Sequence, residues 1–146
     1  MFIGTYYHTI EEKGRVAVPS KFRENLGSPV IITRGFDGCL FLYARHDWDS
    51  MTSSLTSLSV NKKAHRDYVR YLLQGAEEVI PDAQGRILIP DSLKNSANIS
   101  KQVVFAGSQD KIEVWDMKTY NTYMSDIENR GEEIAEQLDT QTETRT

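Results

Sequence analysis

Cysteine is almost absent from this sequence, which has Cys39 alone among its 146 residues. A single cysteine excludes a disulfide within the chain and is typical of a reducing compartment. The three histidines, His8, His46 and His65, have no cysteine or carboxylate at the spacing of a metal site. We therefore expect no disulfide, no bound metal and no cofactor.

Long apolar runs are also missing. The longest, such as residues 40–43, are far too short to cross a bilayer, and the first four residues show neither a basic stretch nor the start of a signal core. The sequence lacks Gly-x-Ser-x-Gly, a Walker loop and His-Glu-x-x-His. We expect neither membrane insertion nor catalysis, although distant residues can converge on an active site, so an enzyme remains a competing class.

An excess of positive charge is the third absence. The 17 basic and 21 acidic side chains give a net charge of −4, which at first argues against a nucleic-acid partner. However, residues 126–146 alone carry seven acidic and two basic side chains, and residues 1–125 have a net charge of +1. Basic residues gather in residues 13–23 and 62–70; the simplest interpretation of such clusters is a solvated face. Bulk charge therefore does not exclude DNA.

The most informative feature is an internal repeat. Residues 11–19 read Glu-Glu-Lys-Gly-Arg-Val-Ala-Val-Pro, and residues 82–90, at an offset of 71, read Asp-Ala-Gln-Gly-Arg-Ile-Leu-Ile-Pro. Residues 30–35 and 40–43 also resemble residues 103–107 and 112–115, at an offset that has grown to 72. Ordered matches over this length indicate a duplication.

Each copy is predicted to form two strands, a short helix and a hairpin. Gly14 and Gly85 supply positions where a positive φ costs little, so each Gly-Arg step is expected to close a turn between strands. Residues 16–18 and 87–89 are predicted as short buried strands, and the prolines that follow lack a ladder donor and end them.

Longer helices are predicted after each copy, because apolar residues recur at helical spacing. We interpret these positions as packing surface and not as a cofactor site. The expected helix caps are Ser20, Asp91, Asp47 and Gly75. The apolar faces comprise Trp48, Met51, Leu55 and Leu58; Ala64, Tyr68, Tyr71 and Leu72; Tyr120, Tyr123, Met124 and Ile127; and, beyond Gly131, Ile134 and Leu138.

On its two motifs, residues 11–15 and 82–86, the chain resembles the MraZ family of bacterial transcriptional regulators, which carry an acid-x-x-x-Arg motif in each of two repeats. The resemblance covers nearly the whole sequence apart from the tail. One departure is that Glu11 stands where the family usually has Asp, and its longer side chain is expected to change how the carboxylate braces the turn or the arginine.

The resemblance implies an α+β, mainly β fold: a duplicated AbrB-like (SpoVT–AbrB) swapped-hairpin β-barrel with flanking helices, assembling into a ring of eight or more subunits. It also implies a cytoplasmic, nucleoid-associated regulator of the division and cell-wall gene cluster. Its partner would be double-stranded DNA, at short direct repeats upstream of its own operon, with no small-molecule substrate. The expected division is repeat 1 at residues 1–46, a helical connector at 47–76, repeat 2 at 77–118, a C-terminal helix at 119–139 and a disordered tail at 140–146.

The candidate DNA-reading residues are Arg15 and Arg86, because a guanidinium fork can pair bidentately with guanine or with phosphate. A carboxylate four residues earlier is expected to hold each fork. We expect phosphate contacts from Lys13, Lys21 and Arg23. The residues expected to support the motifs are Glu11, Gly14, Asp82, Gln84 and Gly85.

Other interpretations stay open. Glu11–Arg15 and Asp82–Arg86 can be surface ion pairs that only fasten each hairpin and add little stability. Arg86 has fewer basic neighbours than Arg15, so its contact with DNA is less strongly indicated than that of Arg15. A protein-interaction scaffold, or an antitoxin-like AbrB module, is the alternative to a DNA-binding regulator.

Overall fold

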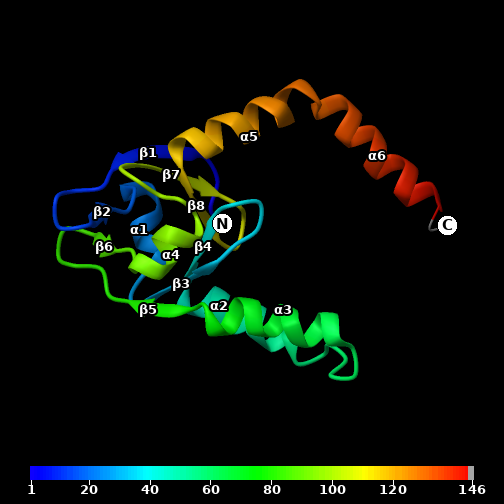
Figure 1. The fold of residues 1–146 in the computed structure, drawn as a ribbon, viewed down its shortest axis with the longest axis horizontal. Coiled ribbons are helices and arrows are strands. Elements are labelled where there is room, and N and C mark those ends of the chain that lie inside the picture. Colours follow the sequence, from blue (N-terminus) through cyan, green and yellow to red (C-terminus); the bar gives the residue numbers. More distant parts are fainter. Residues whose placement is uncertain (145–146) are drawn as a thin grey trace.

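The computed structural model describes residues 1–144 and the side chains of residues 1–138 (Figure 1). Eight strands form one six-stranded sheet, in the order β1-β7-β8-β4-β3-β5, and a separate two-stranded ribbon of β2 and β6. All the pairings are antiparallel. The strands are β1 Thr5–Thr9, β2 Arg15–Ala17, β3 Val30–Arg34, β4 Leu40–Ala44, β5 Glu77–Val79, β6 Arg86–Leu88, β7 Gln102–Gly107 and β8 Ile112–Asp116.

The two repeats share their strands. In each repeat the element order is strand, strand, short helix, strand, strand, as the sequence predicted. Strands β3 and β4, and β7 and β8, form the expected hairpins, and β4 pairs with β8 between the repeats. The first strand of each repeat pairs with the hairpin of the other: β1 lies beside β7, and β5 lies beside β3. The α+β, mainly β class is therefore confirmed, and the repeats form one interleaved body.

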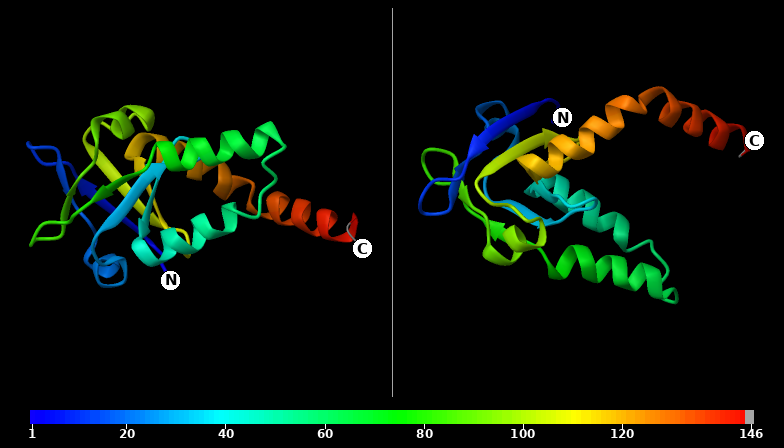
Figure 2. Two further views of the ribbon diagram at one scale, coloured as in Figure 1. Left: turned by 90° about the horizontal axis from the view of Figure 1, so that it is seen from below. Right: turned by 45° about the horizontal axis from the view of Figure 1, so that its top comes forward.

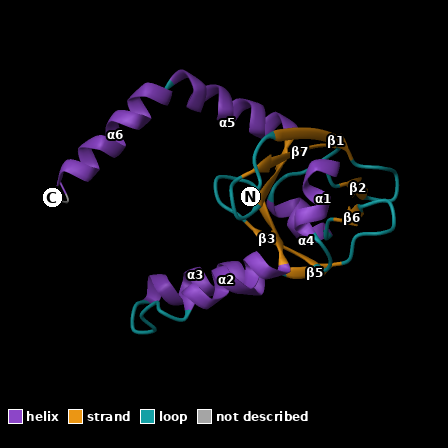
Figure 3. Ribbon diagram, turned by 180° about the vertical axis from the view of Figure 1, so that it is seen from behind, coloured by secondary structure: helices purple, strands orange, loops and turns teal. Residues whose placement is uncertain are grey.

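Both faces of the sheet are covered, which explains why Val30, Ile31, Ile32 and Thr33 are all buried. On one face Val30 and Ile32 belong to a core that includes residues of the ribbon and of two short helices, α1 (Ser20–Leu26) and α4 (Asp91–Ser96). On the other face Ile31 packs with residues of three longer helices: α2 (Arg45–Leu55), α3 (Lys63–Gln74) and α5 (Met117–Asn129). The sheet is the middle of three layers (Figure 3).

Two helical arms extend from the sheet on the side away from the ribbon (Figures 1 and 2). One is the α2–α3 hairpin, and the other is α5 continued by α6 (Gly131–Thr144). Their bases pack on the sheet through Trp48, Met51, Leu72 and Tyr120, which confirms these positions as packing surface. No helix in the described part of the chain is long and apolar enough to span a membrane.

Three local predictions are wrong. Asp47 does not cap α2, because the helix begins after Ala44 and Asp47 lies in its first turn, where a negative charge suits the helix dipole. The N-cap positions of α1 and α4 are occupied by Pro19 and Pro90, one residue before the predicted caps Ser20 and Asp91. Leu58 lies beyond the end of α2.

The C-terminal tail also differs from expectation. Helix α6 extends to Thr144, although residues 140–146 were expected to lack regular structure, and residues 145–146 lie outside the described part. Good helix formers, namely Glu, Gln, Ala and Leu, make up much of the segment before residue 140, and they extend the helix without an apolar anchor.

Candidate nucleic-acid interface

Each Gly-Arg motif closes a tight turn just before its strand of the ribbon, and because β2 and β6 are antiparallel the two turns lie at opposite ends of the ribbon. Gly14 and Gly85 have φ values of 80° and 76°, the left-handed region that favours glycine. In the first turn the N–H of Gly14 donates to the carbonyl of Glu11, and the N–H of Glu11 donates to the carbonyl of Arg15, both at 2.8 Å. The same two bonds in the second turn join Gly85 and Arg86 to Asp82, both at 2.9 Å. The predicted turns are confirmed.

The ribbon presents one face outward. Its register pairs Arg15 with Leu88, Val16 with Ile87 and Ala17 with Arg86. Val16 and Ile87 are fully buried, so the flanking residues of both strands point the other way. Arg15 and Arg86 therefore stand on the same face as diagonal neighbours.

Arg86 is held by two carboxylates. Its Nε donates to Oδ2 of Asp82 at 2.8 Å, and its Nη1 donates to Oε2 of Glu11 at 2.9 Å. Oδ1 of Asp82 also accepts from the backbone N–H groups of Gln84 and Arg86, both at 2.9 Å. The Arg86 N–H, and next its guanidinium, lower the pKa of Asp82, and the Asp82 carboxylate raises the pKa of Arg86. Asp82 thus braces its turn and its arginine together.

Arg15 differs from Arg86 in the contacts of its side chain. Within the described residues, its side chain has no ion pair and no hydrogen bond. The expectation that Glu11 would hold Arg15 is wrong: Glu11 reaches across the ribbon to Arg86 instead. The reason is side-chain length, because Asp82 can fold back onto its own turn, whereas the extra methylene of Glu11 carries its carboxylate to the opposite turn.

Both arginines border one open hollow of about 450 Å³, lined by Glu11, Glu12, Lys13, Arg15 and Arg86. Lys13 is exposed at the turn, and Lys21 is exposed on α1. Arg23 has a structural contact: its Nε donates to the Val18 carbonyl at 2.8 Å, and its side chain lies directly against Gly85, where an added Cβ would come within 2.4 Å of Nε. The structure thus brings the two motifs together and places Arg23 beneath the second turn.

Leu88 is an outward-facing residue that the sequence did not indicate. Residues 87–89 were predicted as a uniformly buried strand, but Leu88 is 47% exposed on the outward face, opposite Arg15. An alternation of period two within that strand would have indicated this position. The ribbon therefore offers an apolar group beside an unpaired guanidinium, and both types of contact are used to recognise base edges.

Groups suited to metal binding or nucleophilic chemistry are few. Among the described side chains, those of residues 1–138, no cluster of three or more His, Cys, Asp or Glu could hold a metal ion. Cys39 is buried, and burial, with the charge of Glu113 adding to it, raises the pKa of its thiol to about 12. The reactive thiolate is therefore hardly formed at neutral pH.

Comparison with known proteins gives a consistent result. A family model described as "MraZ protein, putative antitoxin-like" matches the chain twice, at residues 1–71 and 72–142. A transcriptional regulator MraZ from Thermoanaerobacter sp. (strain X514) is 43% identical over 139 residues, which are 95% of this chain and 97% of the relative. The protein of the same name from Acetivibrio thermocellus is 44% identical over 138 residues, 94% and 96% of the two chains. The duplication read from the sequence is confirmed.

Proposed function

Since the chain belongs to the MraZ family of transcriptional regulators, we propose that it recognises specific DNA sequences through the outward face of the β2–β6 ribbon. The observation that carries this proposal is the unpaired Arg15 guanidinium on an uncovered two-stranded ribbon. A ribbon of this kind fits the major groove of B-DNA, where a guanidinium can take both acceptors of a guanine.

The two arginines have separate roles in this proposal. Arg15 reads a guanine, and the neighbouring Leu88 contacts an apolar base edge such as a thymine methyl. Arg86, already engaged by two carboxylates, shapes the ribbon and meets the phosphate backbone. Lys13 and Lys21 contact phosphates and set the position of the ribbon without reading sequence. Arg23, Gly14, Gly85 and Gln84 support the turns.

Several copies that bind DNA together supply the affinity that one ribbon lacks. The near-neutral body of the chain exerts little long-range attraction on DNA. We propose that several copies assemble into a ring, so that repeated ribbons meet direct repeats upstream of the protein's own operon at high effective concentration. The exchange of first strands between the repeats supports the AbrB-like swapped-hairpin arrangement within each copy. The proposed setting is the cytoplasm, at the nucleoid, with the division and cell-wall gene cluster as the target.

The same proposal assigns a role to each part of the chain. Residues 1–46 and 77–118 together form the DNA-binding body, and residues 47–76 and 119–139 form the arms that link copies. The arms extend away from the ribbon, so contacts between copies leave the DNA-binding face uncovered (Figure 2).

The test is binding of the full chain to its own upstream region, compared with a scrambled duplex, at several salt concentrations. We expect Arg15→Ala to weaken specific binding by ~1–3 kcal/mol and to leave binding to the scrambled duplex nearly unchanged. Arg45→Ala is the matched control, because Arg45 is an exposed arginine on α2 that is ion-paired to Asp49 and Glu78, away from the ribbon. Equal binding by the wild type and by Arg15→Ala/Arg86→Ala would refute the proposal and favour a protein-interaction scaffold or antitoxin-like module.

A further inference from the structure

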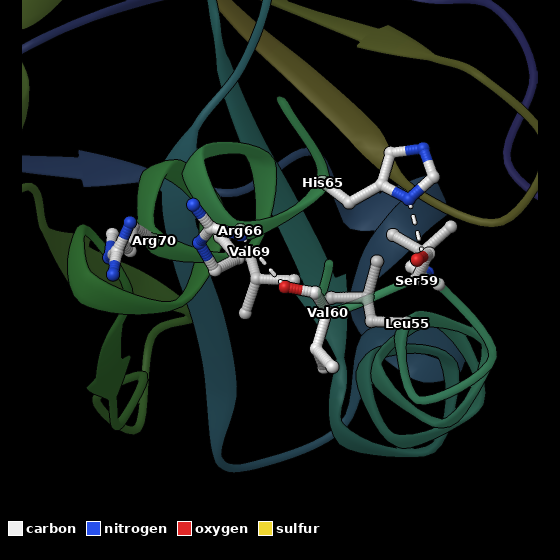
Figure 4. A pocket seen from close by; sticks show the side chains of 8 residues that line it. Leu55, Ser59, Val60, His65, Arg66, Val69 and Arg70 are labelled. Atoms are coloured by element: carbon white, nitrogen blue, oxygen red, sulfur yellow. Dashed lines mark hydrogen bonds between the residues drawn. The ribbon is translucent and has the colours of Figure 1, made fainter. Parts of the chain in front are cut away.

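The tip of the α2–α3 arm carries an apolar groove of about 250 Å³. Leu55, Leu58, Val60 and Val69 supply its apolar lining, and Val60 is 76% exposed. His65 accepts a hydrogen bond from the Ser59 N–H and orders the connection between the helices (Figure 4). The groove is therefore an ordered apolar surface at the tip of the arm, and the groove is open to solvent.

Positive charge borders this groove. Lys62, Lys63, Arg66 and Arg70, against Asp67 alone, give residues 62–70 a net charge of +3. Asp67 is shared by Lys63 and Arg70, whereas Arg66 donates only to the Val60 carbonyl, at 2.8 Å, and has no carboxylate partner within the described residues (Figure 4). Helix α3 has no acidic residue in its first turn, so its positive dipole end adds to the rim.

The α5–α6 arm is acidic, in contrast to the basic rim of the α2–α3 groove. Residues 131–144 carry five acidic side chains and no basic one. Ile134 and Leu138 lie one helical turn apart, and Leu138 is 61% exposed. At the α5–α6 junction, Glu128, Glu132, Glu133 and Glu136 gather around one open hollow. Helix α6 therefore presents an apolar pair on a strongly acidic helix.

We propose that α6 of one copy docks in the α2–α3 groove of a second copy. Ile134 and Leu138 enter the apolar groove, and the flanking glutamates face the basic rim. Within one chain the two arms lie well apart, so the contact is made between copies (Figures 1 and 2). Groove and helix are different surfaces, so the contact is head-to-tail and can propagate from copy to copy. This inference takes from the proposed function only that copies associate; it names the surfaces that join them.

Two charge-reversed forms of the full chain test the docking by light scattering after gel filtration, without DNA. Lys62→Glu/Arg66→Glu reverses the rim, and the new glutamates at the start of α3 suit its dipole, so the helix is retained. Glu128→Lys/Glu133→Lys reverses the acidic arm. We expect the wild type to form multimers and each variant alone to fall to the mass of one chain, 16.7 kDa.

Mixing the variants shows which surfaces meet. The acidic arm of the first variant matches the basic rim of the second, and the basic arm of the second matches the acidic rim of the first, so an equimolar mixture is expected to form multimers larger than 16.7 kDa in which the two variants alternate. A chain carrying all four substitutions is expected to regain the wild-type mass. A monomeric wild type, variants that keep the wild-type mass, or a mixture that stays monomeric would each overturn the docking. None of these outcomes bears on Arg15, whose effect on DNA binding is measured separately.

Discussion

Glu11→Gln gives a sharp test of the idea that Glu11 restrains Arg86 at the proposed DNA-binding face. The substitution keeps the shape of the side chain and removes its charge. Asp82 still holds Nε of Arg86, so the guanidinium stays in place while its Nη1 loses its ionic partner. The hollow beside Arg15 becomes more positive by one unit.

The size of the effect follows from counterion release. Each phosphate neutralised on B-DNA makes the slope of log K against log salt more negative by about 0.9. If the released Nη1 gains one phosphate contact, affinity falls about 3.5-fold more than that of the wild type between 50 and 200 mM salt. At low salt the variant binds more tightly. A phosphate contact carries no sequence information, so the ratio of specific to scrambled binding does not rise.

Fluorescence anisotropy with labelled specific and scrambled duplexes measures these slopes. Glu12→Gln is the matched control, because Glu12 lines the same hollow and loses the same charge without releasing an arginine. The reasoning is refuted if Glu11→Gln and Glu12→Gln have the same salt slope, or if tighter binding is confined to the specific duplex. Half of the Glu11 side chain is exposed, so we expect little change in melting temperature.

Three further outcomes follow from the structure. Gly85→Ala should lower the thermal midpoint, because alanine at φ 76° is strained and its Cβ would clash with Arg23, and calorimetry measures the loss. Because the pKa of Asp82 is lowered in the folded state, the ionised Asp82 carboxylate stabilises the protein fully at neutral pH, and this stabilisation is lost as the pH falls through that pKa. The difference in thermal midpoint between the wild type and Asp82→Asn should therefore shrink below about pH 4, in melts recorded from pH 7 to 2.5. Cys39, with its thiol pKa raised to about 12, should react with a thiol reagent at pH 8 only after unfolding in urea, as a colorimetric assay would show.

Local structure was largely predictable because it depends on residues close in sequence. The glycine that permits a positive φ, the arginine after it and the proline that ends the strand predicted both turns and the order of elements in each repeat. The pairing of β1 with β7 was not readable from local pattern, because partners about a hundred residues apart are chosen by the packing of the whole sheet. Only the resemblance to a swapped-hairpin family indicated it.

In the candidate site, too, contacts between side chains close in sequence were predictable and contacts between distant ones were not. The spacing of Asp82 and Arg86 predicted their ion pair, because both belong to one turn. The pair between Glu11 and Arg86 spans 75 positions and depends on the ribbon register that makes Arg15 and Arg86 diagonal neighbours. The exposure of Leu88 depends on that register too. Interactions within a turn follow from sequence, whereas those across the ribbon need the tertiary structure.

If the ribbon binds DNA as proposed, carrying both repeats in one chain has a consequence for the kind of DNA site that suits it. Two identical chains would present two identical turns, and a two-fold symmetric reader matches a palindrome. Here Asp82 and Glu11 differ by one methylene, both carboxylates hold Arg86, and Arg15 is left unpaired. The ribbon therefore has a direction. Head-to-tail docking between copies would repeat that direction from one ribbon to the next, as direct repeats require, whereas a two-fold contact would turn alternate ribbons around.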